Sequence, residues 1–467
     1  MPQELSASAK RTIFAVLMCC AFLAMLDSQI VATALPTIVQ EFGGMEQYSW
    51  VAASYLITHS AVMPISGKLG DLFGRKTVLL AAVVIFLLGS LACGVAPSMN
   101  SLIAARLFQG LGAGGIIVSV FAVTGDLFEP RERARYQSFS SLVLLLSAAV
   151  GPVLGGVMTE YWGWRSIFLA NLPLGGVALV LLIKVLPDQP TGRKPKIDYL
   201  GGTVIAALVT CLVIWSDSPQ LFGSFTAQPA IALLVGLIIL SFVFVWAERR
   251  APEPIIALSI LRHRVIWKLL AISVGAGSIA LGLANFHALY LQKTTGLAPS
   301  AAGSFFIVLM LGISAGSLVS GRWISRTGQY RKVMCLGLAG CAVMFLLLAF
   351  LPAGQPLWVL GVLFAGLGLT SGLGQQVPTL LAQLHAPKKD LGSTTGAVSL
   401  FRIAGAAVAT SLYGSILNQR LPSEGSAAAA DLGPAEFAHA FTGVYGLAAA
   451  VMVACCILGA TLPAKQD

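Results

Sequence analysis

Several ionisable side chains lie within long apolar stretches of the chain, where charge is costly and usually functional. Asp27 is the only acidic residue deep in such a stretch, and Arg106 and His59 lie in two others. At 1.5 Å per residue, Asp27 lies about 22 Å from the start of its stretch, and Arg106 about 9 Å from the opposite boundary. The two stretches run in opposite directions, so we expect these two side chains to reach similar depths.

Proton transfer is the chemistry that these residue types favour. The carboxylate of Asp27 can take up and release a proton, whereas Arg106 stays charged and can only bias such a proton site. The imidazole of His59, with an ordinary pKa of about 6.5, is a candidate relay. The alternatives are a permanent structural ion pair for Asp27, a helix-packing cation for Arg106 and a hydrogen-bonded packing residue for His59.

A second set of charged residues flanks a tight turn in the segment 67–76, which reads GKLGDLFGRK. The carboxylate of Asp71 can interact with the positive N-terminus of a helix. Arg75 can pair with Asp126, at the end of another apolar stretch. We predict that these contacts, with Gly67 and Gly74, form a latch that closes one side of the molecule. A simple turn would explain Gly74 but not Asp71.

Other residues indicate packing and binding. In the cluster Gly151-Pro152-Val-Leu-Gly155-Gly156, Pro152 is expected to kink its helix, and the three glycines permit close approach of a neighbouring helix. Polar and aromatic side chains that could line a binding cavity are Tyr55, Asn285, Phe286, Tyr290, Phe305, Phe306, Gln375, Gln376 and Arg402.

The composition shows what kind of molecule must position these residues. The chain has 467 residues, of which 57% are hydrophobic and only 10% charged, against roughly 45–50% and about 25% in soluble domains. This excludes soluble, disordered, collagen-like and disulfide-stapled classes. The eight cysteines lie inside apolar runs without metal-ligand spacing, so no metal site is expected. A polytopic membrane protein remains, with the lipid bilayer as its solvent.

A spanning helix needs about 20 mostly apolar residues, and that window gives fourteen candidate spans. They cover about 12–36, 50–69, 77–97, 100–123, 138–158, 166–186, 198–216, 228–246, 268–291, 299–321, 333–352, 356–378, 394–417 and 438–461. Of the 29 Lys and Arg residues, 24 then fall on one side, 3 on the other, and Arg106 and Arg402 within spans. The positive-inside rule places both termini in the cytoplasm. The net charge of +10 thus reflects topology, and no nucleic-acid partner is expected.

Several motifs in this order resemble one family. The 67–76 loop and its weaker copy at 321–332 resemble the loop signature of the major facilitator superfamily. The segments 26–36, 106–115 and 151–156 are similar to the first-helix motif of its fourteen-span drug:proton antiporter group, the proton-coupling motif and the antiporter motif. The segments 164–173, 290–296 and 402–405 resemble three further signatures of the same antiporter group. The chain departs from the pattern at Ser325, which replaces the acidic residue of the second loop, and has no acidic residue in the last six spans.

The resemblance implies an all-α polytopic fold. It comprises an N-terminal six-helix bundle over 1–187, two inserted transmembrane helices with flanking loops over 188–250, and a C-terminal six-helix bundle over 251–467. In this fold the first and fourth spans line a central cavity, so the resemblance implies a contact or a shared water between Asp27 and Arg106. The helix that begins near Thr394 is then the candidate partner of Asp71.

The resemblance also implies a function. We expect a monomeric, proton-coupled antiporter that exports amphipathic drugs or toxic compounds across the cytoplasmic (inner) membrane by alternating access, without a cofactor. No Gly-rich Lys-Ser/Thr phosphate loop is present, which excludes ATP-driven export. Alternatives are export of an endogenous metabolite or lipid-like compound and uptake by symport. An enzyme or receptor is disfavoured, because the chain has no metal cluster, nucleophile triad or extramembrane domain. The substrate can be a lipophilic monocation, a zwitterion or a neutral drug.

Overall fold

The computed structural model describes residues 6–42, 48–187, 198–216, 218–256, 258–280, 283–297, 299–420 and 433–463. All regular structure within these residues is helical. Helices are the expected solution, because the lipid interior offers no water to the backbone and each helix satisfies its own N–H and C=O groups.

The helices follow one another with short connections. The first group comprises α1 (Ala7–Phe42), α2 (Tyr48–Phe73), α3 (Arg75–Gly94), α4 (Met99–Leu127), α5 (Pro130–Trp162), α6 (Arg165–Leu169) and α7 (Asn171–Val185). Next come α8 (Tyr199–Ser216), α9 (Ser218–Phe222), α10 (Gln228–Arg250) and α11 (Leu258–Arg262). The last group comprises α12 (Arg264–Ala280), α13 (Ala284–Thr295), α14 (Pro299–Thr327), α15 (Tyr330–Ala349), α16 (Leu357–Gln375), α17 (Val377–His385), a 3₁₀ turn (Lys388–Asp390), α18 (Leu391–Arg420) and α19 (Pro434–Ala460).

Helices occupy each of the fourteen windows expected from the sequence. Twelve helical segments in the described part of the chain are long and apolar enough to cross a membrane. The other two windows hold α2 and the pair α12–α13, which are not among the segments that are both long enough and apolar enough. The all-helical membrane fold is confirmed, while the count of fourteen spans stays a prediction.

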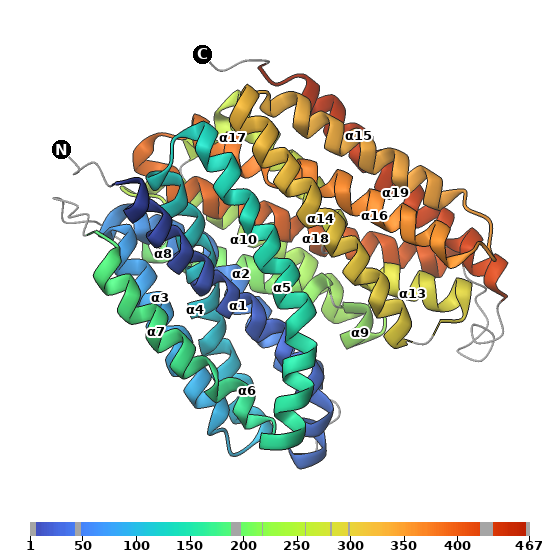
Figure 1. Cartoon of the computed structure of the whole chain (residues 1–467), viewed down its shortest axis with the longest axis horizontal. Coiled ribbons are helices and arrows are strands. Elements are labelled where there is room, and N and C mark those ends of the chain that lie inside the picture. The colour runs from blue at the N-terminus through green and yellow to red at the C-terminus, as the bar shows by residue number, and fades with distance from the viewer. Residues whose placement is uncertain are drawn as a thin grey trace.

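The helices form two bundles that meet at one end and diverge at the other (Figure 1). Helices α1–α7 share buried clusters around residues such as Leu17, Phe86 and Phe168, whereas α12–α19 pack around Phe345 and Phe441. Helices α8 and α10 pack against each other, and α8 contacts both α2 and α18. The boundaries at 187/188 and 250/251 remain predictions.

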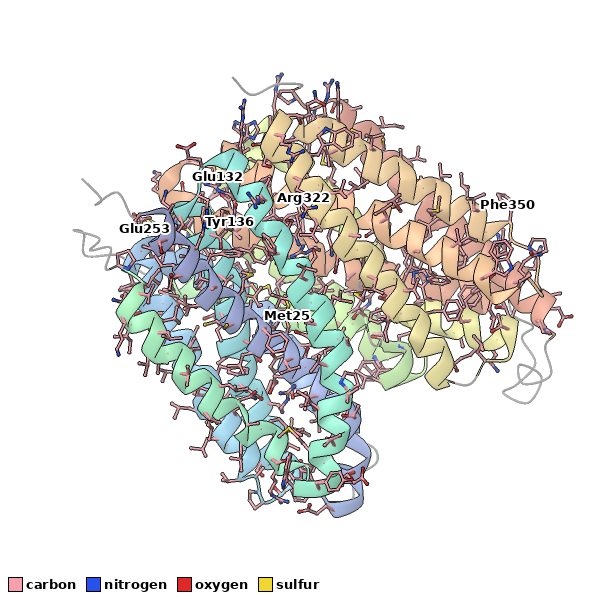
Figure 2. All side chains as sticks on the ribbon, viewed as in Figure 1. Met25, Glu132, Tyr136, Glu253, Arg322 and Phe350 are labelled. Carbon is pink, nitrogen blue, oxygen red and sulfur yellow. The ribbon has the colours of Figure 1, made fainter. Side chains whose placement is uncertain are left out.

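Contacts between the bundles gather at the end where they meet. Ser314 of α14 donates to the carbonyl of Ser141 on α5 at 3.0 Å, and Gln137 donates to Gln383 at 2.9 Å. Gln137 and Ser141 lie in the first half of α5, Ser314 lies near the middle of α14, and Gln383 lies in α17. Figure 2 places Glu132 and Arg322 at this end and Phe350 at the far end of the C-terminal bundle. The start of α1 and the end of α19 lie on the side of the molecule where the bundles meet (Figure 1).

Candidate functional site

A buried ion pair joins the two in-span charges predicted to interact. Arg106 of α4 donates from Nη1 to Oδ2 of Asp27 on α1 at 2.6 Å. Asp27 is 2% exposed and Arg106 1% exposed. Their opposite helix directions and similar depths produce the contact that the sequence predicted. Removing one partner from such a pair leaves an uncompensated buried charge, which typically costs about 3–5 kcal/mol.

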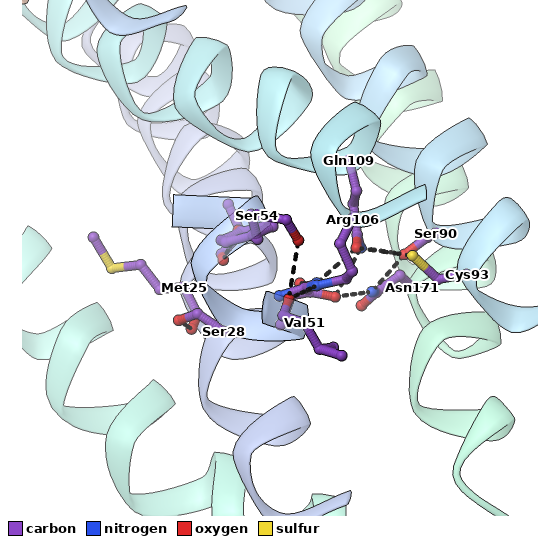
Figure 3. A network of polar contacts seen from close by, with 12 residues as sticks. Met25, Ser28, Val51, Ser54, Ser90, Cys93, Arg106, Gln109 and Asn171 are labelled. Atoms are coloured by element: carbon purple, nitrogen blue, oxygen red, sulfur yellow. Dashed lines mark hydrogen bonds and ion pairs between the residues drawn. The ribbon is translucent and has the colours of Figure 1, made fainter. Parts of the chain in front are cut away.

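Neutral donors complete the surroundings of the Asp27 carboxylate (Figure 3). Gln109 of α4 and Asn171 of α7 each donate a side-chain N–H to Oδ1 of Asp27 at 2.8 Å. Both amides also donate to the hydroxyl of Ser90 on α3 at 2.7 Å. Arg106 Nη1 in turn donates to Oε1 of Gln109 at 2.7 Å. Both oxygens of Asp27 therefore act as hydrogen-bond acceptors in every polar contact that the carboxylate makes.

This network lies inside the N-terminal bundle. The family fold had led us to expect Asp27 and Arg106 on the face that lines the central cavity instead. The members of the network come from α1, α3, α4 and α7, and Ser90 and Gln109 are fully buried. Tyr55, expected in the substrate cavity, belongs to the same network. Its ring lies under the Arg106 guanidinium at 4.1 Å, and its hydroxyl donates to the carbonyl of Ala24 at 3.0 Å. Solvent therefore reaches Asp27 only after helices move.

His59 lies one helical turn from Tyr55 and stacks on its ring, with centroids 5.8 Å apart. Among the described residues, no hydrogen bond joins His59 to Asp27 or Arg106. Backbone atoms of His59 pack against Gly110 and Gly114 of α4, where a Cβ atom would overlap them. The structure thus places His59 beside the network without connecting it, and its role as a relay stays a prediction.

Asp71 makes the helix-terminus contact expected of a latch. Its two carboxylate oxygens accept from the backbone N–H groups of Gly392 and Ser393, at 3.0 and 2.8 Å. These groups open α18, two residues before the Thr394 start predicted from the sequence. The contact crosses from α2 in the N-terminal bundle to α18 in the C-terminal bundle.

Arg75 lies next to this contact and is itself buried. It pairs with Asp71 and, through Nε, with Oδ2 of Asp126 at 3.0 Å. Gly74 precedes it with φ of 90°, a left-handed conformation that favours glycine. Gly67 allows α2 to touch α18, because a Cβ atom there would overlap the carbonyl of Gly392. The five predicted latch residues therefore meet at the closed end.

The second loop copy reproduces the packing but not the charge. Gly321 of α14 packs against Ala134 and Ser138 of α5, as Gly67 packs against α18, and Gly328 has φ of 66°. At the position equivalent to Asp71, Ser325 donates to the carbonyl of Arg322 in its own helix. The charged latch is thus confined to one of the two related interfaces.

The glycine cluster of α5 serves helix packing in part. Cβ atoms on Gly151 and Gly155 would overlap Gln29, Ile30 and Thr33 of α1. Gly156 has no neighbour within 4 Å, so the expectation that it permits close approach was wrong. This residue faces away from α1 on the helix. Helix α5 runs unbroken from Pro130 to Trp162 with Pro152 inside it.

The remaining candidate cavity residues divide into several groups. Tyr290 is 2% exposed and packs on Phe441 and Tyr445 inside the C-terminal bundle, which contradicts a cavity position. The side chain of Asn285 lies outside the described residues. The half-buried ones are Phe286, which contacts Tyr413; Phe305, which contacts Phe364; Phe306; Gln375; and Gln376, which reaches Ser140 of α5. Arg402 is half-buried on α18.

One charged cluster, at the end of the N-terminal bundle away from the latch, was missed by the sequence reasoning. Trp164 Nε1 donates to Glu41 Oε2 at 2.7 Å, and Arg165 Nη1 lies 2.7 Å from Glu41 Oε1. These two donors hold the pKa of the Glu41 carboxyl below its usual range, with the Trp164 hydrogen bond the larger cause. The cluster ties the end of α1 to the start of α6. The Trp-Arg pair, in a segment otherwise apolar, was the available signal.

Comparison with known proteins places this geometry in a family. The sequence profile described as Major Facilitator Superfamily matches residues 17–410 and, in a second match, 270–464. The chain belongs to the major facilitator superfamily. The overlap of the two matches agrees with two related halves.

Curated relatives of this superfamily member are named as transporters. An uncharacterized MFS-type transporter of Mycobacterium tuberculosis is 34% identical over 426 residues, which cover 90% of this chain and 62% of that protein. The chain thus spans less than two thirds of the length of that relative. The multidrug transporter protein MdtP of Bacillus subtilis is 29% identical over 90% of this chain and 77% of its own length. Multidrug resistance protein fnx1 of Schizosaccharomyces pombe is 31% identical, covering 88% and 75%.

Solved structures share the fold of this superfamily member. The human organic anion transporter MFSD10 superposes with a TM-score of 0.69 at 16% identity, covering 96% of this chain and 99% of its own. The proton:xylose symporter XylE gives a TM-score of 0.64 at 15% identity, covering 96% of each chain. Identities this low show the fold alone.

Proposed function

We propose that this transporter exports amphipathic drugs or toxic compounds across the cytoplasmic membrane in exchange for protons. The observation that carries the proposal is the Asp27–Arg106 pair, an ionised carboxylate sealed in the N-terminal bundle. The printed names of the relatives MdtP and fnx1 support drugs as the substrate class. We further propose cytoplasmic termini, a monomer and the proton gradient as the energy source.

The pair gives a physical reason for coupling. A proton on Asp27 removes the charge that Arg106 needs, and a guanidinium without a partner is costly in a buried site. Proton binding therefore favours any conformation in which Arg106 finds water or another acceptor. Conversely, the conformation seen here, with three donors around the carboxylate, favours proton release. Exchange between two such states couples proton movement to alternating access.

Purified protein in liposomes tests the proposal. With a fluorescent amphipathic dye at equal concentration on both sides and a more acidic exterior, we expect net dye efflux against the gradient that it builds, and this efflux should stop when an uncoupler collapses the proton gradient. Efflux that continues after collapse would exclude proton coupling. Uptake driven in the same direction as protons would instead support a symporter.

A further inference from the structure

The inserted helices bring two carboxyl groups together at the end where the bundles meet. Asp198 directly precedes α8, and its Oδ1 accepts from the backbone N–H of Gly201 at 2.8 Å, as a helix N-cap. Glu248 lies in the last turn of α10 and is 4% exposed. Its Oε2 accepts from the backbone N–H of Ile256 at 3.2 Å. One oxygen of each carboxyl group is thus satisfied by the backbone.

The other two oxygens are buried without a partner. Neither Oδ2 of Asp198 nor Oε1 of Glu248 has a hydrogen-bond partner among the described residues. Both oxygens border the same small space, because a Cβ atom on Gly201 would overlap each of them. Two ionised carboxylates so placed would repel each other and leave two acceptors unsatisfied. A single proton removes the repulsion and lets one oxygen donate to the other.

We propose that Asp198 and Glu248 share one proton while the cytoplasmic side is closed, and that they form a proton-binding site separate from Asp27. The two helix ends assign the proton to one partner. Asp198 lies at the positive N-terminus of α8, which favours its ionised form, whereas Glu248 lies at the negative C-terminus of α10, which disfavours charge. The proton therefore sits on Glu248 Oε1 and is donated to Asp198 Oδ2.

Among the described residues, the charged groups around the pair do not replace this proton. The Nζ of Lys68 on α2 is paired with Oε2 of Glu253 at 2.9 Å. Farther along α2, Asp71 and Arg75 pair with each other. On α10 itself, Arg249 is exposed and Arg250 lies over the ring of Trp246 at 4.3 Å. No group of three metal-ligating side chains occurs in the described part of the chain, so a proton fits better than a metal ion.

Hydrogen bonds connect the pair to the latch. Ile256 donates its N–H to Glu248, and the neighbouring carbonyl of Ile255 accepts from the hydroxyl of Ser393. The N–H of Ser393 in turn donates to Asp71. Separation of α2 and α18 on cytoplasmic opening breaks this chain and admits water to the two carboxyl groups. In water both groups ionise near neutral pH and the proton is released to the cytoplasm.

The sign of the pH dependence follows from this difference in bound protons. The closed state holds one more proton than the open state, so each unit rise in cytoplasmic pH favours the open state by up to tenfold. The inference rests on the alternating opening proposed above, but not on proton binding by Asp27. It gives the inserted helices a role as a sensor of cytoplasmic pH.

Cross-linking tests the inference in the full chain in lipid nanodiscs. The native cysteines are replaced, and cysteines at Ser141 and Ser314 report closure between α5 and α14. From pH 6 to pH 8 we expect the closed fraction to fall, with up to a tenfold change in the open-to-closed ratio per unit. Glu248→Gln should stay closed across this range, because its amide N–H donates to Asp198 as the proton does. An unchanged slope in Glu248→Gln would overturn the proposal.

Two glycine substitutions and an infrared measurement extend this test. Gly201→Ala pushes a methyl group between the two oxygens and should open the molecule at every pH. The matched control Gly202→Ala meets Ile255 and Ile65 only at 3.8 and 4.0 Å and should keep the wild-type slope. If Glu248→Gln fails to fold, the infrared carbonyl band of a protonated carboxyl group serves instead. We expect Asp198→Asn to shift this band, and an unshifted band would contradict a shared proton.

The background variant Asp27→Asn separates this inference from the proposed function. We expect the pH dependence of cross-linking to persist in Asp27→Asn. A slope that disappears with Asp27→Asn would assign the titration to Asp27 and overturn the second site, while leaving the coupling proposal intact.

Discussion

At the scale of single residues, Asp27 is held by one cation and two amides that come from three other positions in the chain. Arg106, Gln109 and Asn171 converge on its two oxygens at 2.6 to 2.8 Å. A carboxylate so surrounded cannot accept a proton without disturbing each contact. The chemistry of the residue is therefore tied to the position of α1, α4 and α7.

Replacing Asp27 with Asn is the direct test at this scale. The amide oxygen still accepts from Arg106 but leaves its charge uncompensated, so we expect a lower melting temperature with expression and some substrate binding kept, whereas proton-driven efflux should fall to the level of non-expressing cells. Dye efflux and dye binding measured on the same preparation check this. Ser28→Ala is the matched control, because Ser28 bonds only within its own helix and lies apart from the network (Figure 3). Efflux at the wild-type rate in Asp27→Asn would mean that another residue binds the transported proton, and His59 would be the next candidate.

How far the sequence predicted this site depends on the kind of residue. A charge within an apolar span stands out, so Asp27 and Arg106 could be identified and their depths compared. Gln109 and Asn171 did not stand out, because neutral amides are tolerated in such spans and nothing in the chain says which way they point. The spacing of Gln109, three residues after Arg106, put both on one helical face and was the available signal.

At the scale of helices, small residues decide which pairs can touch. Helix α5 packs on α1 through Gly151 and Gly155, four residues apart, and α2 packs on α18 through Gly67. The spans and the loop turn were predictable from apolar length and glycine spacing. The face that each glycine presents was not, since adjacent glycines such as Gly155 and Gly156 differ only in their rotation about the helix axis.

These adjacent glycines provide a matched pair of substitutions. Gly155→Ala would overlap the backbone carbonyl of Ile30, which cannot move cheaply, and overpacking typically costs about 1–3 kcal/mol. We expect a lower melting temperature in detergent and reduced transport. Gly156→Ala meets nothing within 4 Å and should behave as wild type. Equal effects of the two substitutions would contradict the assigned α1–α5 interface.

At the scale of the whole molecule, the polar contacts between the two bundles that involve described residues gather toward one end. Asp71 and Arg75 gather there with Gln137, Gln383 and the inserted helices (Figure 2 shows the neighbouring Glu253 at the same end). The internal repeat predicted two related interfaces. The repeat did not predict that, among the described residues, the charged latch occurs at only one of these interfaces. The available signal was Ser325, which stands in place of an acidic residue.

The latch prediction belongs to this scale, because it concerns the balance between two states of the entire molecule. Asp71 accepts two N–H groups at the start of α18, and a helix-end interaction is worth about 0.3–1 kcal/mol, or up to about 2 when partly buried. A loss of about 1.4 kcal/mol shifts a two-state balance tenfold. We expect Asp71→Asn to lower cross-linking between cysteines at Ser141 and Ser314 by about this factor and to slow turnover, while substrate binding at equilibrium is kept. Ser325→Ala, at the equivalent uncharged position, is the control and should leave cross-linking unchanged. Unaltered cross-linking in Asp71→Asn would reduce the loop to a turn whose charges only orient the chain in the membrane.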